Sequence, residues 1–259
     1  MLLAIDCGNT NIVFTLFEGR EHRGEWRIET KQGRTGDEYT AWLSHLLSLS
    51  DLSLQQIDDV IIASVVPMVT EHLKRFANHN LNCQPMVIGE PNVILGVTVD
   101  IDMPSQVGAD RLVNAQAAAM TASLPAVILD FGTATTFDLM KPGHIYAGGV
   151  IAPGIALSAK ALTQAAARLP EIDISPFGDD LPIIGRDTQA AMRAGIFWGY
   201  VAMIEGVIAR IQKSQTSPIS VIATGGLAHL FAPHIEAITE VDNHLTMRGL
   251  LEIYEMNKV

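Results

Sequence analysis

Basic residues are scarce in this sequence. It has 17 Lys+Arg and 28 Asp+Glu, which give a formal net charge of −11, and the basic residues form no continuous run. We therefore do not expect nucleic acid or an anionic membrane surface as a main partner, because both attract clustered cations. An acidic protein that binds an anionic substrate needs local compensation, which metal ions, helix N-termini or a few placed arginines can supply.

Cysteine is also scarce, and histidine is scattered. The two cysteines, Cys7 and Cys83, form neither a disulfide framework nor a metal-ligand spacing. Because the sequence near Cys7 holds no base to activate a thiol, we interpret it as a small buried residue at a strand end. The eight histidines show no HxxxH or HExxH spacing, so none is predicted as a metal ligand.

Long apolar runs are the third shortage. No run approaches the roughly 20 residues that span a bilayer, and no basic region precedes the N-terminal apolar segment. These absences favour a soluble cytoplasmic protein. With 259 residues, 48% hydrophobic residues and a mean hydropathy of +0.26, the chain has material for one large domain or two ordinary ones with a sizeable core.

Residues 2–17, LLAIDCGNTNIVFTLF, organise the rest of the chain. An apolar run ends in Asp6, a Gly8-Asn9-Thr10 turn follows, and a β-rich pattern then resumes, which predicts a strand, a turn and an antiparallel strand. The turn gathers backbone N–H groups, an amide, a hydroxyl and a carboxylate. Such groups can cradle a phosphate and hold its metal ion. An ordinary hairpin is the alternative interpretation.

The remaining pattern alternates strands and helices, which is typical of an α/β layer architecture. Further strands are predicted at residues 24–29, 60–65, 85–88, 126–130, 135–140, 145–151 and 219–224. Helices are predicted at 37–49, 67–78, 108–123, 154–167, 187–212, 226–231 and 245–256. Residues 168–185 are expected to form an exposed loop, a candidate lid or partner contact.

The second half of the chain opens as the first does. Residues 126–140, AVILDFGTATTFDLM, repeat the order of strand, Asp-x-Gly turn and strand, and Asp130 lies 124 positions after Asp6. A single duplication on this scale predicts two related lobes whose phosphate-binding turns face one cleft. Residues 221–228, VIATGGLA, add a strand that enters a helix through Gly225-Gly226, where a glycine pair permits close approach of a planar group.

Together these motifs resemble the two phosphate loops and the adenosine motif of the sugar kinase, chaperone and actin superfamily. Within it, the chain is similar to the type III pantothenate kinases, also through GADR at 108–111, GGVIAPG at 148–154, IGRDT at 184–188 and LTMRGL at 245–250. The resemblance implies an α/β fold of two duplicated ribonuclease H-like lobes, the actin-like ATPase fold. Each lobe would be a mixed sheet flanked by helices, with the lobes at 1–113 and 114–259.

The resemblance also implies an activity, ATP-dependent phosphorylation of pantothenate to 4'-phosphopantothenate, the first step of coenzyme A biosynthesis. The implied cofactors are ATP with Mg²⁺ and a monovalent cation, K⁺ or NH₄⁺. The implied assembly is a homodimer with the active site at its interface. Phosphoryl transfer depends chiefly on positioning and charge neutralisation, which glycine-rich loops and cations supply.

Carried over by position, the resemblance assigns roles to particular residues, with Asp110 as the catalytic base. Before the resemblance is considered, a local ion pair is the preferred interpretation of Asp110-Arg111. The implied ATP-binding residues are Asp6, Cys7, Gly8, Asn9, Thr10, Asn11, Ile12, Val13, Thr133, Gly225 and Gly226. The implied pantothenate-binding residues are Gly108, Ala109, Asp110, Arg111 and, across the dimer interface, Thr188. The implied metal-site residues are Asp6 for magnesium, through water, and Asp130 for the monovalent cation.

One departure and several alternatives remain open. Ile101 stands where many family members have an aromatic residue, which puts a wall contact to pantothenate in doubt. Another kinase or a phosphatase of the superfamily is one alternative, although the chain lacks the cysteine–histidine zinc cluster of repressor-related sugar kinases. A regulatory protein without turnover is a second alternative, against which the intact Asp6, Asp110 and Asp130 argue. Filament formation like that of actin is a third, which no sequence feature requires.

Overall fold

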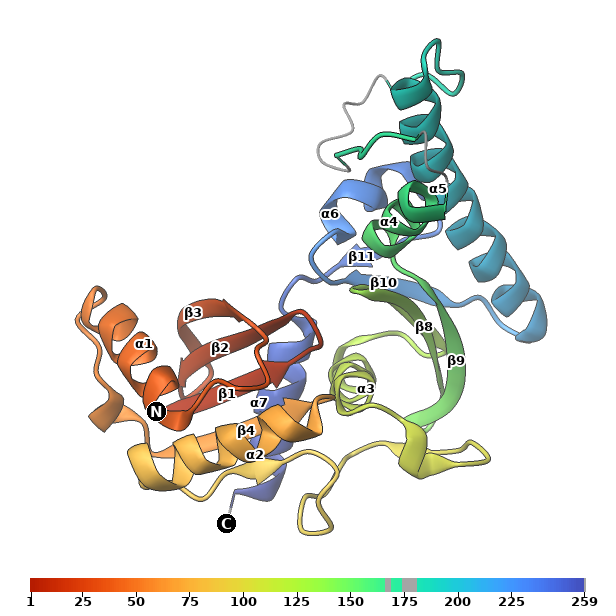
Figure 1. The fold of residues 1–259 in the computed structure, drawn as a ribbon. Helices are drawn as coiled ribbons and strands as arrows, with labels where there is room; N and C mark the ends of the chain where they lie inside the picture. Colours follow the sequence, from red (N-terminus) through yellow and green to blue (C-terminus); the bar gives the residue numbers. More distant parts are fainter. Residues whose placement is uncertain (166–168, 174–180, 259) are drawn as a thin grey trace. The chain divides into compact units, whose positions relative to one another are not determined.

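Residues 1–165, 169–173 and 181–258 are described by the computed structural model of the chain (Figure 1). They divide into two compact units, each with its own sheet. Unit 1 comprises Met1–Thr98, Asp102–Met120 and His244–Val259, and unit 2 comprises Val99–Ile101 and Thr121–Asn243.

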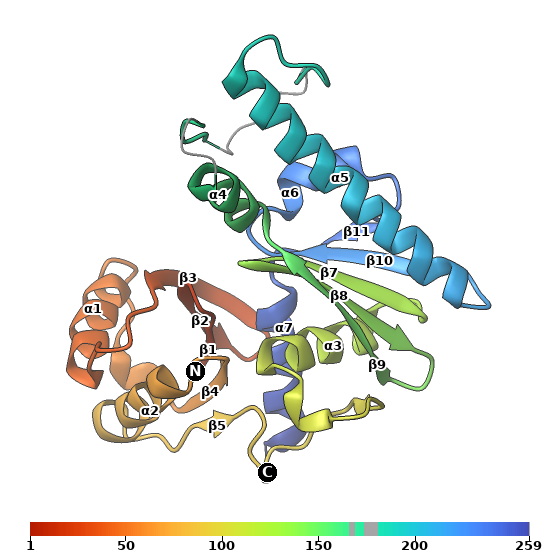
Figure 2. The same ribbon diagram turned by 45° about the vertical axis from the view of Figure 1, so that its right-hand side comes forward.

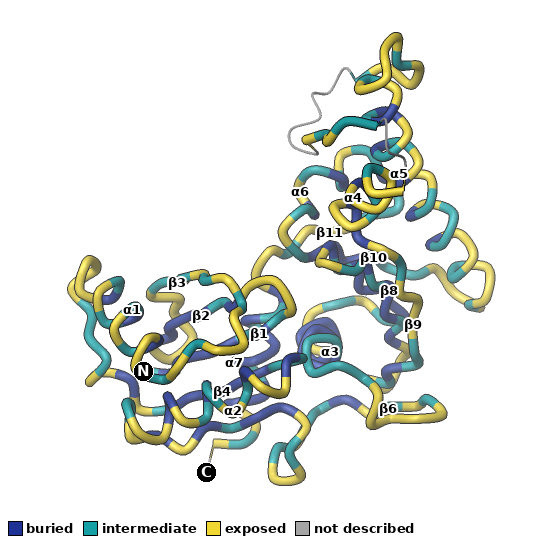
Figure 3. Tube along the Cα trace, viewed as in Figure 1, coloured by how far each residue is buried: buried dark blue, intermediate teal, exposed yellow. Residues whose placement is uncertain are grey.

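The sheet of unit 1 has five strands in the order β3-β2-β1-β4-β5. The strands are β1 (Leu2–Cys7), β2 (Asn11–Glu18), β3 (Glu21–Glu29), β4 (Asp59–Ser64) and β5 (Met86–Val87). β1, β2 and β3 pair antiparallel, whereas β4 runs parallel to β1 and β5 parallel to β4. The sheet is therefore mixed. Figure 3 shows that β1 and β4 are buried along most of their length.

Helices cover this sheet. They are α1 (Gly36–Ser48), α2 (Pro67–Arg75), α3 (Ala109–Thr121) and α7 (Leu245–Asn257), with short helical turns at Leu54–Gln56, Phe76–Asn80 and Pro104–Gln106. Thr35 and Glu38 form a capping box at the start of α1. The aromatic rings of Phe14, Tyr39 and Phe76 pack together in the core on this side. α7 packs on β1 and β4.

The sheet of unit 2 has six strands in the order β11-β10-β7-β8-β9-β6. The strands are β6 (Thr98–Val99), β7 (Ala126–Phe131), β8 (Ala134–Lys141), β9 (Ile145–Pro153), β10 (Ser220–Thr224) and β11 (Glu240–Val241). β7, β8 and β9 pair antiparallel, whereas β10 runs parallel to β7 and β11 parallel to β10. The helices of this unit are α4 (Ile155–Ala165), α5 (Thr188–Ser214) and α6 (Ala228–Phe231), followed by a short turn at Ala232–His234. Figure 2 shows α5 and α6 beside β10.

Helix α5 is long and apolar enough to cross a membrane by length and composition, with a mean hydropathy of 1.4 over 18 residues. A long helix was predicted here, at 187–212, and the charged residues Arg193, Glu205 and Arg210 interrupt its apolar sequence. The helix packs Phe197, Val201 and Ile204 into the core formed with Val127 and Leu129 of β7. A core helix of this kind passes the same test, so α5 is weak evidence for a membrane span.

The predicted fold class is confirmed, since the described residues form two mixed sheets flanked by helices. The hairpin of β1 and β2 in unit 1 closely resembles the hairpin of β7 and β8 in unit 2. β1 and β7 each have six residues with the same burial order, in which only the fifth residue, Asp6 or Asp130, is partly exposed. Asp6 pairs with Val13 and Asp130 with Thr136 in equivalent antiparallel hairpins.

The two compact units are defined by the contacts between residues, whereas the predicted lobes, 1–113 and 114–259, are defined by the two halves of the duplicated sequence. The C-terminal helix α7 belongs to unit 1, although it is last in the chain. The boundary of the duplication itself stays a prediction. Of the predicted loop at 168–185, residues 168 and 174–180 lie outside the described part of the chain.

Candidate active site

The predicted first phosphate loop joins β1 to β2 through Gly8, Asn9 and Thr10. The Gly8 backbone N–H donates to the carbonyl of Asn11 at 3.0 Å, which closes the turn. Thr30 on the neighbouring segment fixes it, because its hydroxyl donates to the Gly8 carbonyl at 2.7 Å and its N–H to the Thr10 carbonyl at 2.9 Å. The side chains of Asn9, Thr10 and Asn11 stay exposed. The turn is thus held by its backbone, and its polar side chains are exposed to solvent.

Asp6 and Cys7 precede this turn and differ in environment. Asp6 is half-buried on β1, between Val13 of β2 and Ala63 of β4. Cys7 is buried, and burial raises the pKa of its thiol to about 11. The thiol is therefore protonated near neutral pH and is not an activated nucleophile. The interpretation of Cys7 as a small buried residue at a strand end agrees with this environment.

This protonation leads to a prediction about thiol reactivity. Burial raises the pKa of the Cys83 thiol as well, and both side chains are shielded. We expect the native protein to react with a disulfide reagent such as DTNB at pH 8 at least tenfold more slowly than the unfolded chain, because the thiolate is the reacting species. The release of thionitrobenzoate with and without denaturant measures this. Rapid native reaction of either thiol would contradict the assigned burial.

The GADR segment lies beside the first loop within unit 1. A side-chain carbon at Gly108 would come within 3.4 Å of Cγ1 of Val65, and the Val65 N–H donates to the carbonyl of Cys7 at 3.1 Å. Val65 therefore lies between Gly108 and the end of β1 and contacts both. Asp110 and Arg111 are half-buried in the first turn of α3, and the Asp110 carboxylate accepts the backbone N–H of Arg111 at 2.8 Å.

The second phosphate loop joins β7 to β8 in unit 2. The Gly132 N–H donates to the carbonyl of Ala134, two residues on, at 3.1 Å, whereas the Gly8 N–H of the first loop bonds the carbonyl three residues on. An added side-chain carbon at Gly8 or at Gly132 would lie 3.3 Å from the carbonyl oxygen that its N–H bonds. The Gly154 N–H donates to the carbonyl of Thr133 at 3.2 Å, and Gly132 and Thr133 are exposed. In both loops a glycine N–H closes the turn, and the second loop is one residue shorter than the first.

The late glycine pair lies against this second loop. Gly225 has φ +90°, and a side-chain carbon there would be 2.5 Å from a carboxylate oxygen of Asp130 and 2.7 Å from the carbonyl oxygen of Phe131. Only glycine fits this close approach without strain. Gly226 faces open space at its Cα. Unit 2 therefore brings Asp130, Thr133 and the glycine pair to one end of its sheet.

Thr188 is the first residue of α5, directly after the N-cap Asp187, whose carboxylate accepts the Ala190 N–H at 2.8 Å. Its side chain is exposed and lines an open groove of about 550 Å³ in unit 2. Apolar residues line the rest of that groove: Leu162, Leu169, Ala191, Met192, Gly195 and Ile196. Thr188 thus lies on a surface that is mainly apolar.

The predicted site residues gather in two groups. Unit 1 holds the first loop and the GADR segment, and unit 2 holds the second loop and the glycine pair. Three residues that support these groups were not predicted: Thr30, Val65 and Gly154. Gly154 is the last residue of the GGVIAPG motif and the predicted start of a helix, but neither signal links it to Thr133. The hydrophobic Val65 carries no signal in the sequence that links it to residue 108.

Solved structures with the same fold are known. A structure described as a conserved putative Baf family transcriptional activator from Campylobacter jejuni superposes with a TM-score of 0.60, at 22% identity over 98% of both chains. A putative 2-dehydro-3-deoxygalactonokinase from Sinorhizobium meliloti gives a TM-score of 0.56 at 11% identity, over 99% of this chain and 96% of that one. The chain therefore has the actin-like kinase and ATPase fold.

Sequence comparison narrows the class to a family. The family model described as type III pantothenate kinase matches residues 2–210. The type III pantothenate kinase of Caulobacter vibrioides is 50% identical over 100% of this chain and 98% of its own length. That of Rhodospirillum rubrum is 49% identical over 100% of this chain and 99% of its own length. The chain belongs to the type III pantothenate kinase family.

Proposed function

We propose that this protein transfers the γ-phosphoryl group of ATP to the primary hydroxyl of pantothenate and so forms 4'-phosphopantothenate, the first step of coenzyme A biosynthesis. The observation that carries the proposal is the contact chain from Gly108 through Val65 to Cys7. It joins the segment assigned to the acceptor with the loop assigned to phosphate. The membership of the chain in the family supplies the identity of the acceptor.

The residues near Asp6 fit a magnesium ion. The half-buried Asp6 carboxylate and the exposed Asn9 and Thr10 side chains offer oxygen donors, which this hard cation prefers. The buried Cys7 thiol is protonated and so offers no competing soft ligand. When bound with ATP, magnesium supplies charge neutralisation at the transferring phosphate. Asp6 orients it, most simply through water, because one or two carboxylates usually suffice for this ion.

Asp130 is proposed to hold the monovalent cation, K⁺ or NH₄⁺. Its carboxylate and the carbonyl oxygen of Phe131 both lie against Gly225, so two oxygen donors meet at one point. Thr133 is proposed to contact phosphate, and the Gly225-Gly226 backbone to lie against the adenosine. A positive ion at Asp130 offsets part of the charge of the triphosphate in a protein with a net charge of −11.

Asp110 is proposed to orient the pantothenate hydroxyl and accept its proton as the bond to phosphorus forms. The guanidinium group of Arg111, with its planar fork of donors, suits the carboxylate of pantothenate. Gly108 and Ala109 would approach the substrate with their backbone. Thr188 would contact the substrate bound to the partner subunit of a homodimer, and the protein would work in the cytoplasm.

An acceptor-dependent assay tests this function. We expect release of ADP only when ATP, Mg²⁺ and pantothenate are all present, with faster release when K⁺ or NH₄⁺ replaces Na⁺. A coupled assay of ADP, with phosphopantothenate identified by mass spectrometry, measures both products. ADP release without an acceptor would favour a phosphatase, and ATP binding without any product would favour a regulatory protein. Either result would overturn the proposal.

A further inference from the structure

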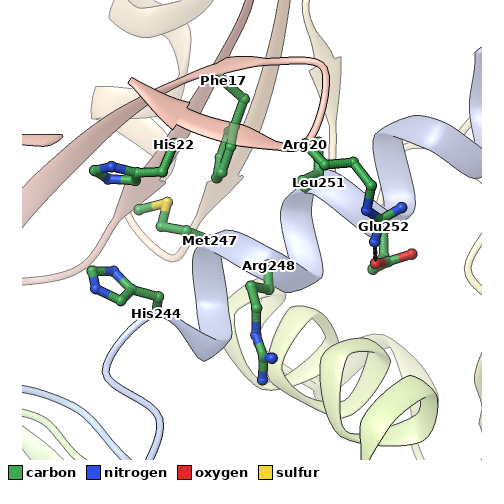
Figure 4. A pocket seen from close by; sticks show the side chains of 8 residues that line it. All are labelled: Phe17, Arg20, His22, His244, Met247, Arg248, Leu251 and Glu252. Atoms are coloured by element: carbon green, nitrogen blue, oxygen red, sulfur yellow. Dashed lines mark hydrogen bonds and ion pairs between the residues drawn. The ribbon is translucent and has the colours of Figure 1, made fainter. Parts of the chain in front are cut away.

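A second cluster of side chains lies at the other end of the sheet in unit 1. β2 starts at the first phosphate loop with Asn11 and ends at Glu18. Its eight residues span roughly 25 Å. At that distal end, β3 and the start of α7 come together around a pocket of about 430 Å³ (Figure 4). The pocket is lined by Phe17, Arg20, His22, His244, Met247, Arg248, Leu251 and Glu252.

A β-bulge places His22 and Glu25 on the same face of β3. Residues three apart on a regular strand point to opposite faces. Here the register shifts, so that His22 pairs with Phe17, Gly24 with Leu16 and Glu25 with Thr15, which leaves Arg23 as the extra residue. Because Thr15 and Phe17 are two apart on β2, their partners Glu25 and His22 share one face.

The start of α7 brings a second imidazole to this face. His244 is the N-cap residue of α7, and its Nδ1 lies 3.6 Å from Oε2 of Glu25. The ring centres of His22 and His244 are 5.6 Å apart, with 55° between the ring planes. Figure 4 shows the two rings one above the other at the side of Met247. The ligand atoms of His22, Glu25 and His244 all lie within 4.8 Å of one another.

We propose that His22, Glu25 and His244 bind a divalent transition metal ion, of which zinc fits best. Two imidazoles and one carboxylate form a ligand set that zinc uses, with water in the fourth position. Ligand atoms around tetrahedral zinc are about 3.3 Å apart, so these atoms must close by roughly 1.5 Å. All three side chains are exposed, so rotation about their side-chain bonds can supply that movement. Magnesium and calcium prefer oxygen ligands and fit less well.

The charges around the cluster are compatible with a bound cation. Arg23 pairs with Glu18 at 3.2 Å and with Glu21 at 3.7 Å, and Arg20 pairs with Glu252 and Glu255. The region holds more negative than positive side chains. Its four arginines are Arg20, Arg23, Arg27 and Arg248, and its five glutamates are Glu18, Glu21, Glu25, Glu252 and Glu255.

The position of His244 gives the ion a structural role. The chain leaves unit 2 at Asn243 and re-enters unit 1 at His244, where α7 begins. An ion held by His22, Glu25 and His244 would tie the start of that helix to β3. Because it would bind the folded chain in preference to the unfolded one, it would stabilise the fold in proportion to its occupancy. This site is separate from the proposed kinase site, so it stands or fails independently of the proposed function.

Calorimetric titration of the full-length, nucleotide-free protein with ZnCl₂ tests the site. Excess MgCl₂ keeps the oxygen-ligand sites occupied. We expect one ion per chain with micromolar or tighter affinity and a melting temperature raised by several degrees. His22→Ala, Glu25→Gln and His244→Asn should each weaken zinc binding at least tenfold and abolish the thermal shift. Asparagine is chosen at 244 because it is a good N-cap residue and preserves the start of α7.

His45→Ala is the matched control, because His45 is an exposed histidine of unit 1 on α1, away from this cluster. It should bind zinc as the unmodified protein does. Cobalt provides a second measurement that needs no change in stability, since tetrahedral Co²⁺ absorbs strongly in the visible range and His22→Ala should remove that absorption. Unchanged binding in His22→Ala and His244→Asn, or an equal loss in His45→Ala, would overturn the proposal.

Discussion

Asp110→Asn is expected to lower the turnover of pantothenate phosphorylation by about 10²- to 10⁴-fold, the range that a positioned general base contributes. Asparagine has nearly the same shape but cannot accept the proton of the attacking hydroxyl. The affinity for ATP should remain within about threefold, because the residues assigned to ATP lie on the two phosphate loops and the glycine pair. Steady-state kinetics and nucleotide titration measure the two quantities separately.

The local structure explains why this carboxylate is suited to the role. A side chain at Gly108 would collide with the carboxylate oxygen of Asp110, so glycine leaves the space that the carboxylate occupies. Its Oδ1 already accepts the Arg111 N–H, which fixes the orientation of the group, and the residue is only half-buried. A carboxylate offers several lone pairs, so it can accept a hydrogen bond from a substrate hydroxyl in addition to the one from the Arg111 N–H.

Asp102→Asn is the matched control for this experiment. Asp102 is an exposed carboxylate eight residues earlier, and its removal changes the net charge by the same amount. Turnover in the control should stay within about twofold of the unmodified protein. If Asp110→Asn kept near-normal turnover, Asp110 would not be the base. If it lost ATP affinity as well, its role would be structural.

Local patterns in the sequence were sufficient for most of the helices and strands. The hairpins around Gly8 and Gly132 follow from apolar strands that end in an acid and a polar turn, and the structure has both. Helix α1, predicted at 37–49, begins at Gly36, and its N-cap is Thr35, which forms a capping box with Glu38 three residues later. These signals act between residues that are close in sequence, so they can be read without knowledge of the fold.

The contacts that complete the sites depend on the fold and could not be read in this way. Gly108 reaches Cys7 only through Val65, an ordinary apolar residue. His22 and His244 are 222 positions apart, and a bulge at Arg23 decides which face His22 shares with Glu25. A search for local metal-ligand spacing therefore passes over both histidines, although the structure places them together.

Gly225→Ala is expected to reduce kcat/KM for ATP by about 10²-fold, the loss that a displacement of about 1 Å in a group that positions the substrate can cause. The physical reason is specific to this position. The backbone at Gly225 has φ +90°, and the added methyl group would be 2.5 Å from the Asp130 carboxylate and 2.7 Å from the Phe131 carbonyl. Either the glycine pair or the carboxylate must move, and both are assigned to ATP and its monovalent cation.

Gly89→Ala separates these causes, because Gly89 has φ +94° but nothing within 4 Å of the added carbon. It therefore carries the same backbone strain without the collision, and it should lower the melting temperature while leaving kcat/KM within about threefold. The potassium concentration that gives half-maximal activity should rise only in Gly225→Ala, since only there is Asp130 displaced. Equal kinetic effects in the two variants would mean that strain alone acts, and the proposed link from Gly225 through Asp130 to the cation would fail.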